Sequence, residues 1–493
     1  MSHDHPSSFP HPTYAQYVLQ PQFDDGKRHL FGHMIAANEA HTLMLAETGI
    51  ISREHASALL NALRQVEERG VDAFEYAPSV EDLFFAVEGR LIELAGPDAG
   101  GNLQLARSRN DLGAAMNRMM LRERLLAARQ QVLDLRAALM DLIREHIETL
   151  MPGITHTQPA QPTTLSHYLL GVLGPLERDS DRLSAAYART NRSALGVAAF
   201  TTSSFPIDRE LVASLLGFDG YVENGYDAVG AGDHLLESVQ ALVNSVGSLS
   251  RFVHDLLVWT RQSEDVLRID DAFIQISSIM PQKRNPVVLE HIRIRMGWTY
   301  GEASAVETIV HNAAFGDTND VEDPMFVPIN RAFDAAEAVY ELLTAVVATL
   351  RFNVEGMAAR AGEGNTTATA LADALVKDYR LPFRSAHGIV SRLVTRTTAE
   401  GSEVSAALVN EISGEVLDEP LQVTDDFVAT TLDPWAFVKA RTLPGGPAPE
   451  ITRKALEAAR SRFDIDAQVL ATDRQRLQDA GTERARQIAA LSA

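Results

Sequence analysis

The sequence predicts an all-α protein whose centre is a bundle of five long helices. One run of apolar residues is spaced alternately by four and three positions, which is typical of a helix packed lengthwise against partner helices. The run consists of Leu235, Val239, Leu242, Val246, Leu249, Val253 and Leu256. Comparable helical patterns cover residues 112–150, 165–189, 287–310 and 331–350. Helices of about 30–60 Å, at about 1.5 Å per residue, exceed what one compact chain needs, so we expect subunits to share the bundle.

The composition is that of an ordinary globular protein with a strongly acidic surface. Of the 493 residues, 45% are hydrophobic and 22% are charged, and the formal net charge is -22. Such a charge disfavours nucleic acid and anionic membranes as partners, although a local basic site can still bind a small polyanion. The absence of cysteine excludes disulfides, thiolate catalysis and cysteine metal sites. The chain shows neither an apolar run long enough for a membrane span nor a signal peptide, so we expect a cytoplasmic location.

Breaks in the helical pattern divide the chain into four segments. We predict a disordered tail over 1–12, an N-terminal helical domain over 13–110, a central bundle over 111–360 and a C-terminal helical domain over 361–493. The N-terminal helices are predicted over 36–45, over 52–66 with Ser52 as N-cap, and over 79–94. The C-terminal domain has shorter helices and ends with a charged helix over 465–491.

One polar segment directly precedes the helix predicted over 287–310. It reads Ser277-Ser278-Ile279-Met280-Pro281-Gln282-Lys283-Arg284-Asn285-Pro286. We predict Asn285 as the N-cap and Pro286 as the first helical residue, which places Lys283 beside the positive end of a helix dipole. Free backbone N–H groups and a nearby lysine bind anions, although a cationic loop that only caps a helix has the same local sequence.

A second polar segment, Arg107-Ser108-Arg109-Asn110-Asp111, directly precedes the helix predicted over 112–150. Arginine binds a carboxylate through two parallel hydrogen bonds, and a helix start adds backbone donors. We predict Asp111 as the N-cap of this helix. The alternative is a capped and solvated helix start without a ligand.

A third polar loop follows the same helix and contains Thr155, His156, Gln158 and two prolines. Hydroxyl, imidazole and carboxamide groups together suit substrate contact and proton transfer. A single histidine is more often structural. Three such loops at the ends of long helices nevertheless favour an active site.

The three segments resemble three separated motifs of the fumarase/aspartase superfamily, and most closely its argininosuccinate lyase branch. Residues 277–286 resemble the superfamily's mobile loop, with Ile276 where the family has glycine. The branch's motifs are intact at 107–111 and 155–162, and segments 205–209 and 216–220 are also similar to it. The resemblance covers roughly residues 30–440.

The resemblance implies a three-domain, fumarase/aspartase-like fold and a homotetramer that shares a 20-helix core. It also implies active sites shared between subunits, a small dicarboxylate substrate, and no metal or other cofactor. The implied reaction is that of a carbon–nitrogen lyase, which eliminates fumarate from an N-substituted L-aspartate. For argininosuccinate the second product is arginine, which would place the enzyme in arginine biosynthesis.

The same resemblance assigns roles to individual residues. It implies that Ser277 is the general base and that Lys283 and Asn285 hold the carboxylate on which charge accumulates. His156, with Thr155, orients the substrate and assists protonation of the leaving nitrogen. The remaining implied substrate contacts are Ser108, Arg109, Asn110, Gln158, Ser278 and Met280. The chemistry requires this equipment, because a carbanion beside a carboxylate needs fixed positive charge, and the same charge makes a serine hydroxyl a better base.

The departures from the branch concern the leaving amine. Phe84 replaces a histidine, residues 230–233 read Gly-Ala-Gly-Asp in place of Ser-Asp-Arg-Asp, and residues 315–324 lack the tyrosine, glutamine and lysine expected to contact the arginine half. Argininosuccinate therefore competes with another N-succinyl amine, such as ethylenediamine disuccinate, or with a hydrazine or nitro nitrogen. A crystallin-like structural protein and an adenylosuccinate lyase are further alternatives. The latter is disfavoured because Gln282 stands where that branch has histidine.

Overall fold

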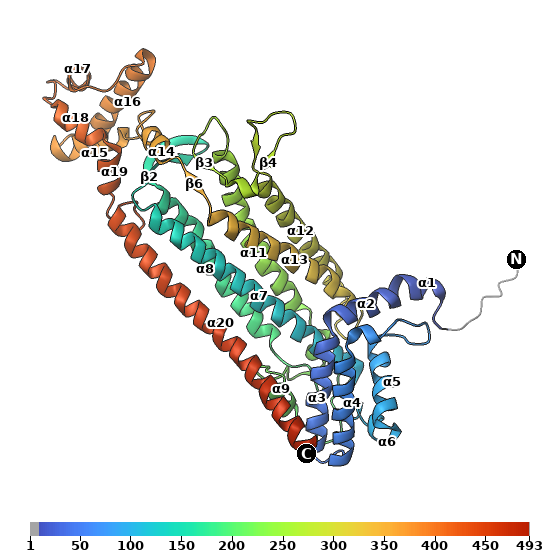
Figure 1. Cartoon of the computed structure of the whole chain (residues 1–493). Helices are drawn as coiled ribbons and strands as arrows, with labels where there is room; N and C mark the ends of the chain where they lie inside the picture. The colour runs from blue at the N-terminus through green and yellow to red at the C-terminus, as the bar shows by residue number, and fades with distance from the viewer. Residues whose placement is uncertain (1–8, 493) are drawn as a thin grey trace.

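Five long helices form an elongated bundle, as the sequence predicts (Figure 1). In this computed structural model, which describes residues 9–492, they are α7 (Arg109–Glu145), α8 (Leu165–Thr190), α11 (Asp233–Trp259), α12 (Val287–Val310) and α13 (Phe326–Val347). Helix α7 packs against α8 and α13, and α11 packs against α8 and α12. The apolar run from Leu235 to Leu256 is buried at every position, which confirms that its spacing marks a face packed between helices.

The N-terminal helices cover one end of the bundle (Figure 1). They are α1 (Pro12–Tyr14), the π-helix η1 (Ala15–Leu19), α2 (Gln20–His29), α3 (Phe31–Glu47), α4 (Arg53–Arg69), the 3-10 helix η2 (Val71–Ala73), α5 (Leu83–Ala95) and α6 (Pro97–Gly100). Ser52 caps α4 as predicted, since its hydroxyl accepts from His55 N at 3.1 Å. Helix α5 begins later than predicted, because Asp82 is its N-cap. Of the tail predicted over 1–12, residues 1–8 lie outside the described residues.

The N-cap of α7 is Ser108, so the prediction of Asp111 as the cap was wrong. Asp111 occupies the third helical position and accepts from Ser108 N at 2.9 Å, which completes a capping box. The helix ends at Glu145 and does not continue to 150, because the chain turns into β1 (Leu150–Thr155), which pairs antiparallel with β2 (Gln158–Thr164).

Shorter elements connect the bundle helices. They are α9 (Arg209–Leu215), α10 (Gly225–Gly230), β3 (Leu267–Arg268), η3 (Asp271–Phe273), β4 (Gln275–Ile276), β5 (Arg284–Asn285), η4 (Asp323–Met325) and β6 (Arg351–Phe352). Strand β3 pairs with β6, and β4 pairs with β5. Within residues 9–492, no helix combines the length and apolar character that crossing a membrane requires.

A small helical domain with its own core lies at the other end of the bundle (Figure 1). Its region comprises α14 (Val354–Ala361), α15 (Ala368–Asp378), α16 (Phe383–Glu400), α17 (Ala406–Val416), α18 (Asp425–Leu432) and α19 (Pro434–Lys439). The final helix, α20 (Pro449–Ser492), begins before the predicted residue 465 and runs back along the bundle to the N-terminal helices. Asp473 accepts from Arg129 of α7 at 2.6 Å and helps to hold α20 there. The predicted domain boundaries remain predictions.

Candidate active site

The segment around Ser277 forms an exposed loop whose two ends are joined by the pairing of β4 with β5. The hydroxyl oxygen of Ser277 accepts hydrogen bonds from Met280 N at 3.1 Å and from Ile279 N at 3.4 Å. Backbone donors directed at an oxygen stabilise its deprotonated, negatively charged form. The loop therefore gives Ser277 the surroundings that a serine base requires.

Positive groups follow Ser277 in the same loop. Lys283 is exposed, and within the described chain its ammonium group makes no ion pair. The prediction that Asn285 caps the next helix was wrong, because Asn285 lies in β5 opposite Gln275 and the N-cap of α12 is Pro286. No side chain of the described residues caps α12, so its first N–H groups are left for an anion.

Ile276 and Arg284 pair with each other where β4 and β5 close this loop. Arg284 does not face the loop, because its guanidinium donates to Ile269 O at 3.1 Å and forms an ion pair with Asp271 of η3. Ile276 lies in β4 with its side chain 70% exposed and has no positive φ. The backbone there therefore does not need the glycine that the superfamily has at this position.

His156 and Thr157 form the two-residue turn between β1 and β2, where Thr155 pairs with Gln158. Their φ angles are 51° and 64°, so both residues are left-handed, as a type I′ turn requires. Glycine and asparagine normally occupy such positions, and a β-branched threonine does so rarely. The hairpin therefore holds an exposed imidazole at its tip in a conformation that costs about 1–3 kcal/mol per residue.

The predicted carboxylate-binding groups at the start of α7 contact carboxylates of their own chain. Arg109 donates to Asp82 at 2.9 Å, and Asn110 Nδ2 donates to Asp317 Oδ2 at 2.5 Å. The hydroxyl of Ser108 donates to Asn110 Oδ1 at 2.9 Å. Ser108 and Asn110 are therefore hydrogen-bonded to each other, and both Asn110 and Arg109 donate to carboxylates of their own chain.

Asp111 links the start of α7 to the segment that follows α8. Its carboxylate is fully buried and accepts from Ser108 N, Gly196 N and Ala198 N, each at 2.9 Å. Burial raises the pKa of Asp111 to about 6, although the three hydrogen bonds act in the opposite direction. The sequence pattern indicated only a capping role for Asp111 and did not indicate this link to the segment after α8.

Glu322 is a second residue near this site that the sequence pattern did not single out. Burial, together with a hydrogen bond and charge repulsion from Asp317, raises the pKa of Glu322 to about 8. Glu322 thus lies beside the Asp317 carboxyl that accepts from Asn110. The available signal was the run of acidic residues at 317, 320, 322 and 323, directly before a long helix.

The departures from the argininosuccinate lyase pattern lie together in space. A Cβ atom on Gly230 would come within 2.7 Å of Gly316 N, so the 230–233 and 315–324 segments approach each other closely. Phe84 is buried in the core next to Phe85, whose ring lies 4.7 Å from the Arg109 guanidinium carbon. All three departing segments therefore surround the start of α7.

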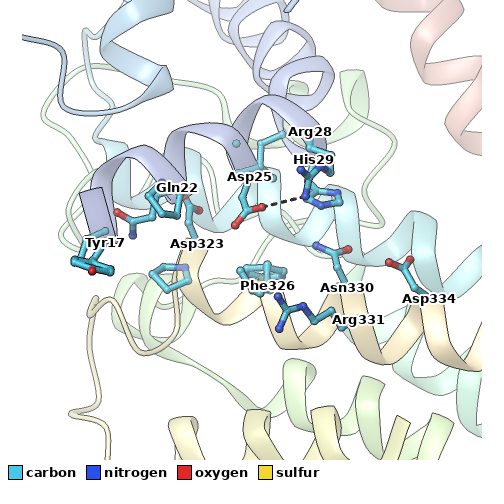
Figure 2. Close-up of a pocket in the computed structure, with 16 residues that line it drawn as sticks. Tyr17, Gln22, Asp25, Arg28, His29, Asp323, Phe326, Asn330, Arg331 and Asp334 are labelled. Atoms are coloured by element: carbon cyan, nitrogen blue, oxygen red, sulfur yellow. Dashed lines mark hydrogen bonds and ion pairs between the residues drawn. The ribbon is translucent and has the colours of Figure 1, made fainter. Parts of the chain in front are cut away.

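A cavity of about 400 Å³ lies beside this region, between α2 and the start of α13 (Figure 2). Asp323 lies in its wall and accepts from Asn117 of α7 at 3.1 Å. Figure 2 also shows Phe326, Arg28 and Arg331 around the space. The segment that departs from the family therefore has a cavity on one side and the start of α7 on the other.

The three predicted motifs do not meet within one chain. The hairpin with His156 and the loop with Ser277 lie at the end of the bundle near the small domain, whereas the start of α7 lies at the opposite end (Figure 1). Helix α7 has 37 residues, which at about 1.5 Å per residue corresponds to a separation of about 55 Å. The structure brings Ser108, Arg109 and Asn110 together, but it places them away from the other two motifs.

Comparisons with known proteins identify the family. Residues 22–300 match the lyase family, and residues 365–439 match the argininosuccinate lyase C-terminal family. An argininosuccinate lyase of Methanothermobacter thermautotrophicus is 38% identical over 455 residues, which are 92% of this chain and 96% of that protein. The argininosuccinate lyase of Halobacterium salinarum is 40% identical over 451 residues, 90% of each chain. A solved structure of an EDDS lyase variant with bound fumarate has a TM-score of 0.86 and 30% identity, covering 99% of this chain and 97% of that one.

The fold, the matched family and these identities place the chain in the fumarase/aspartase superfamily of lyases. The match to the argininosuccinate lyase C-terminal family and the curated relatives agree on a narrower group. The chain belongs to the argininosuccinate lyase branch and is a carbon–nitrogen lyase.

Proposed function

We propose that this chain eliminates fumarate from an N-substituted L-aspartate, with argininosuccinate as the first candidate substrate, and that Ser277 is the base. The observation that carries the proposal is the surroundings of the Ser277 oxygen. It accepts from two backbone N–H groups in a loop that also contains Lys283 and leads to the uncapped start of α12. These features support a group that holds negative charge beside a bound carboxylate.

In the proposed reaction, Ser277 removes a proton from Cβ of the succinyl group. The electron pair moves toward the adjacent carboxylate, which Lys283 and Asn285 hold together with the first N–H groups of α12. The Cα–N bond then breaks, fumarate is released, and the leaving nitrogen gains a proton with the help of His156. Thr155, Gln158, Ser278 and Met280 contact the substrate in this proposal, and Ser108, Arg109 and Asn110 bind its carboxylates.

We propose that the site is completed in a cytoplasmic homotetramer, with one motif from each of three copies. Two observations support this. The start of α7 lies far from the other two motifs in one chain, and α12 exposes large apolar side chains, including Ile294 at 47%, Trp298 at 56% and Tyr300 at 44%. A helix face of this kind is buried when bundles of several copies pack together.

A second candidate substrate is another N-succinyl amine, such as ethylenediamine disuccinate. It is favoured by the carboxyl group of Asp317, which lies in the segment where the branch's arginine-contacting residues are missing. Carboxyl groups attract a protonated amine. Argininosuccinate remains the first candidate because the curated relatives at 36–40% identity are argininosuccinate lyases.

The test follows the ultraviolet absorbance of fumarate with each candidate substrate in turn. Argininosuccinate should give turnover; turnover with ethylenediamine disuccinate alone would shift the assignment to the second candidate. Ser277→Ala should lower kcat by about 100- to 10,000-fold, the usual contribution of a general base. Ser461→Ala is the matched control, because it removes an exposed serine hydroxyl of α20 that belongs to none of the proposed site segments. Full activity of Ser277→Ala would refute the proposed base.

A further inference from the structure

A second cavity, of about 1050 Å³, lies behind the hairpin that holds His156. Six parts of the chain form its walls: the β1–β2 hairpin, the first half of α8, the second half of α11, α15, α19, and the linker between α19 and α20. None of the residues assigned to chemistry above lines it except Thr155, which contributes to the wall from the end of β1. The cavity is large enough for a small molecule of metabolite size.

The charged side chains around this cavity favour an anion. Arg251 and Lys377 are exposed, and neither forms an ion pair within residues 9–492. Arg441 also lines it and lies 3.8 Å from Asp373, while the other acidic group, Asp255, accepts from the Tyr168 hydroxyl at 2.6 Å. Three cationic side chains therefore face two acidic ones, on a chain whose net charge is -22. A positive concave surface on an acidic protein concentrates small anions.

The remaining walls are largely apolar and aromatic. Tyr168, Phe252, Phe437 and Pro444 contribute to them. This combination suits an organic molecule that presents two or more carboxylate or phosphate groups to the cations and an uncharged body to the aromatic side.

The cavity is physically connected to the hairpin. His167 joins the two sides, since one ring nitrogen lies 2.8 Å from Thr163 Oγ1 of β2 and the other lies 2.9 Å from Gly445 O of the linker. Ile154 and Thr155, which lead directly into the left-handed His156–Thr157 turn, are also wall residues. A ligand in the cavity would therefore contact the strand that positions His156.

We propose that this cavity is a regulatory site for an organic polyanion, separate from the active site, and that its occupation changes turnover through the His156 hairpin. The binding part of the inference is independent of the proposed reaction. The effect on turnover rests on the proposed role of His156.

The test measures binding first and turnover second. Citrate and a nucleoside triphosphate, which present carboxylates and phosphates respectively, are titrated by calorimetry against the full-length protein without substrate. At least one should bind, and Arg251→Ala combined with Lys377→Ala should weaken that binding by about tenfold or more while leaving basal turnover unchanged. Lys454→Ala removes an exposed cation of α20 outside the cavity and serves as the matched control.

The outcomes are distinct from those of the activity test. Absence of binding by either probe, or equal binding by the double variant and the control, would overturn the proposed site. Binding that competes with substrate would also overturn it, because the anion would then occupy the active site. A probe that alters kcat, and whose affinity does not depend on the concentration of substrate, would support the proposed site. This outcome does not depend on which amine the enzyme releases.

Discussion

Replacing Asp111 by asparagine should remove a pH-dependent loss of stability between about pH 4 and pH 7. The pKa of this buried carboxyl is raised from 3.8 to about 6 by burial. A carboxyl whose pKa is higher in the folded state stabilises the fold below its unfolded pKa, and that stability is lost as pH rises through the folded value. At about 1.36 kcal/mol for each pKa unit, the ionised Asp111 lowers the free energy of unfolding by about 3 kcal/mol at pH 7.

Asparagine is neutral at every pH, but its Nδ2 must face at least one of the three N–H donors, at a cost that does not depend on pH. Relative to the wild type, the unfolding free energy of Asp111→Asn should therefore rise by up to about 3 kcal/mol between about pH 4 and pH 7. Denaturant unfolding at several pH values measures this difference. Asp141→Asn is the control, because that side chain is 73% exposed. If the difference in unfolding free energy between Asp111→Asn and the wild type stayed constant between pH 4 and pH 7, the reasoning from the raised pKa of Asp111 would be refuted.

Three further predictions concern the loop, the turn and the final helix. Arg284→Ala removes the ion pair with Asp271 at the base of the loop that contains Ser277. The value of kcat should fall about tenfold while the assembly stays intact. Unchanged kinetics would show that this ion pair is not needed to position the loop. Thr157→Gly relieves the backbone strain of a threonine with a positive φ. Thermal unfolding should show that the free energy of unfolding rises by about 1 kcal/mol, and a decrease would contradict the assigned strain. Asp473→Ala leaves the Arg129 guanidinium buried without its carboxylate partner. Hydrogen exchange in α20 should accelerate, and the free energy of unfolding should fall by about 3–5 kcal/mol. Unchanged exchange would show that other contacts hold α20 on the bundle.

The periodicity of the sequence was sufficient for the long helices, because the bundle buries one continuous apolar face on each of them. The start of α12 was less predictable. Asn285 has the residue type of an N-cap, but its pairing with Gln275 places it in a strand, and local preference cannot show such a partner. The same limit applies to Asp111, whose contact with Gly196 spans 85 positions.

For the candidate site too, some features could be predicted from the sequence and others could not. Its residue types could be read from three short segments, because each segment is contiguous in sequence. The contact between Asn110 and Asp317 joins residues 207 positions apart, so no local pattern predicts it. The left-handed turn at His156 was also hidden, since neither histidine nor threonine is a typical residue for a type I′ turn.

In the proposed homotetramer, one active site contains Ser277 of one copy and Asn110 of another. Subunit exchange tests it most directly. Ser277→Ala and Asn110→Ala, each inactive alone, are mixed under conditions that exchange subunits, and fumarate release is measured. Mixed assemblies should regain a fraction of wild-type turnover, because some sites receive both unmodified residues. Inactivity of fully exchanged mixtures would contradict a site shared between copies.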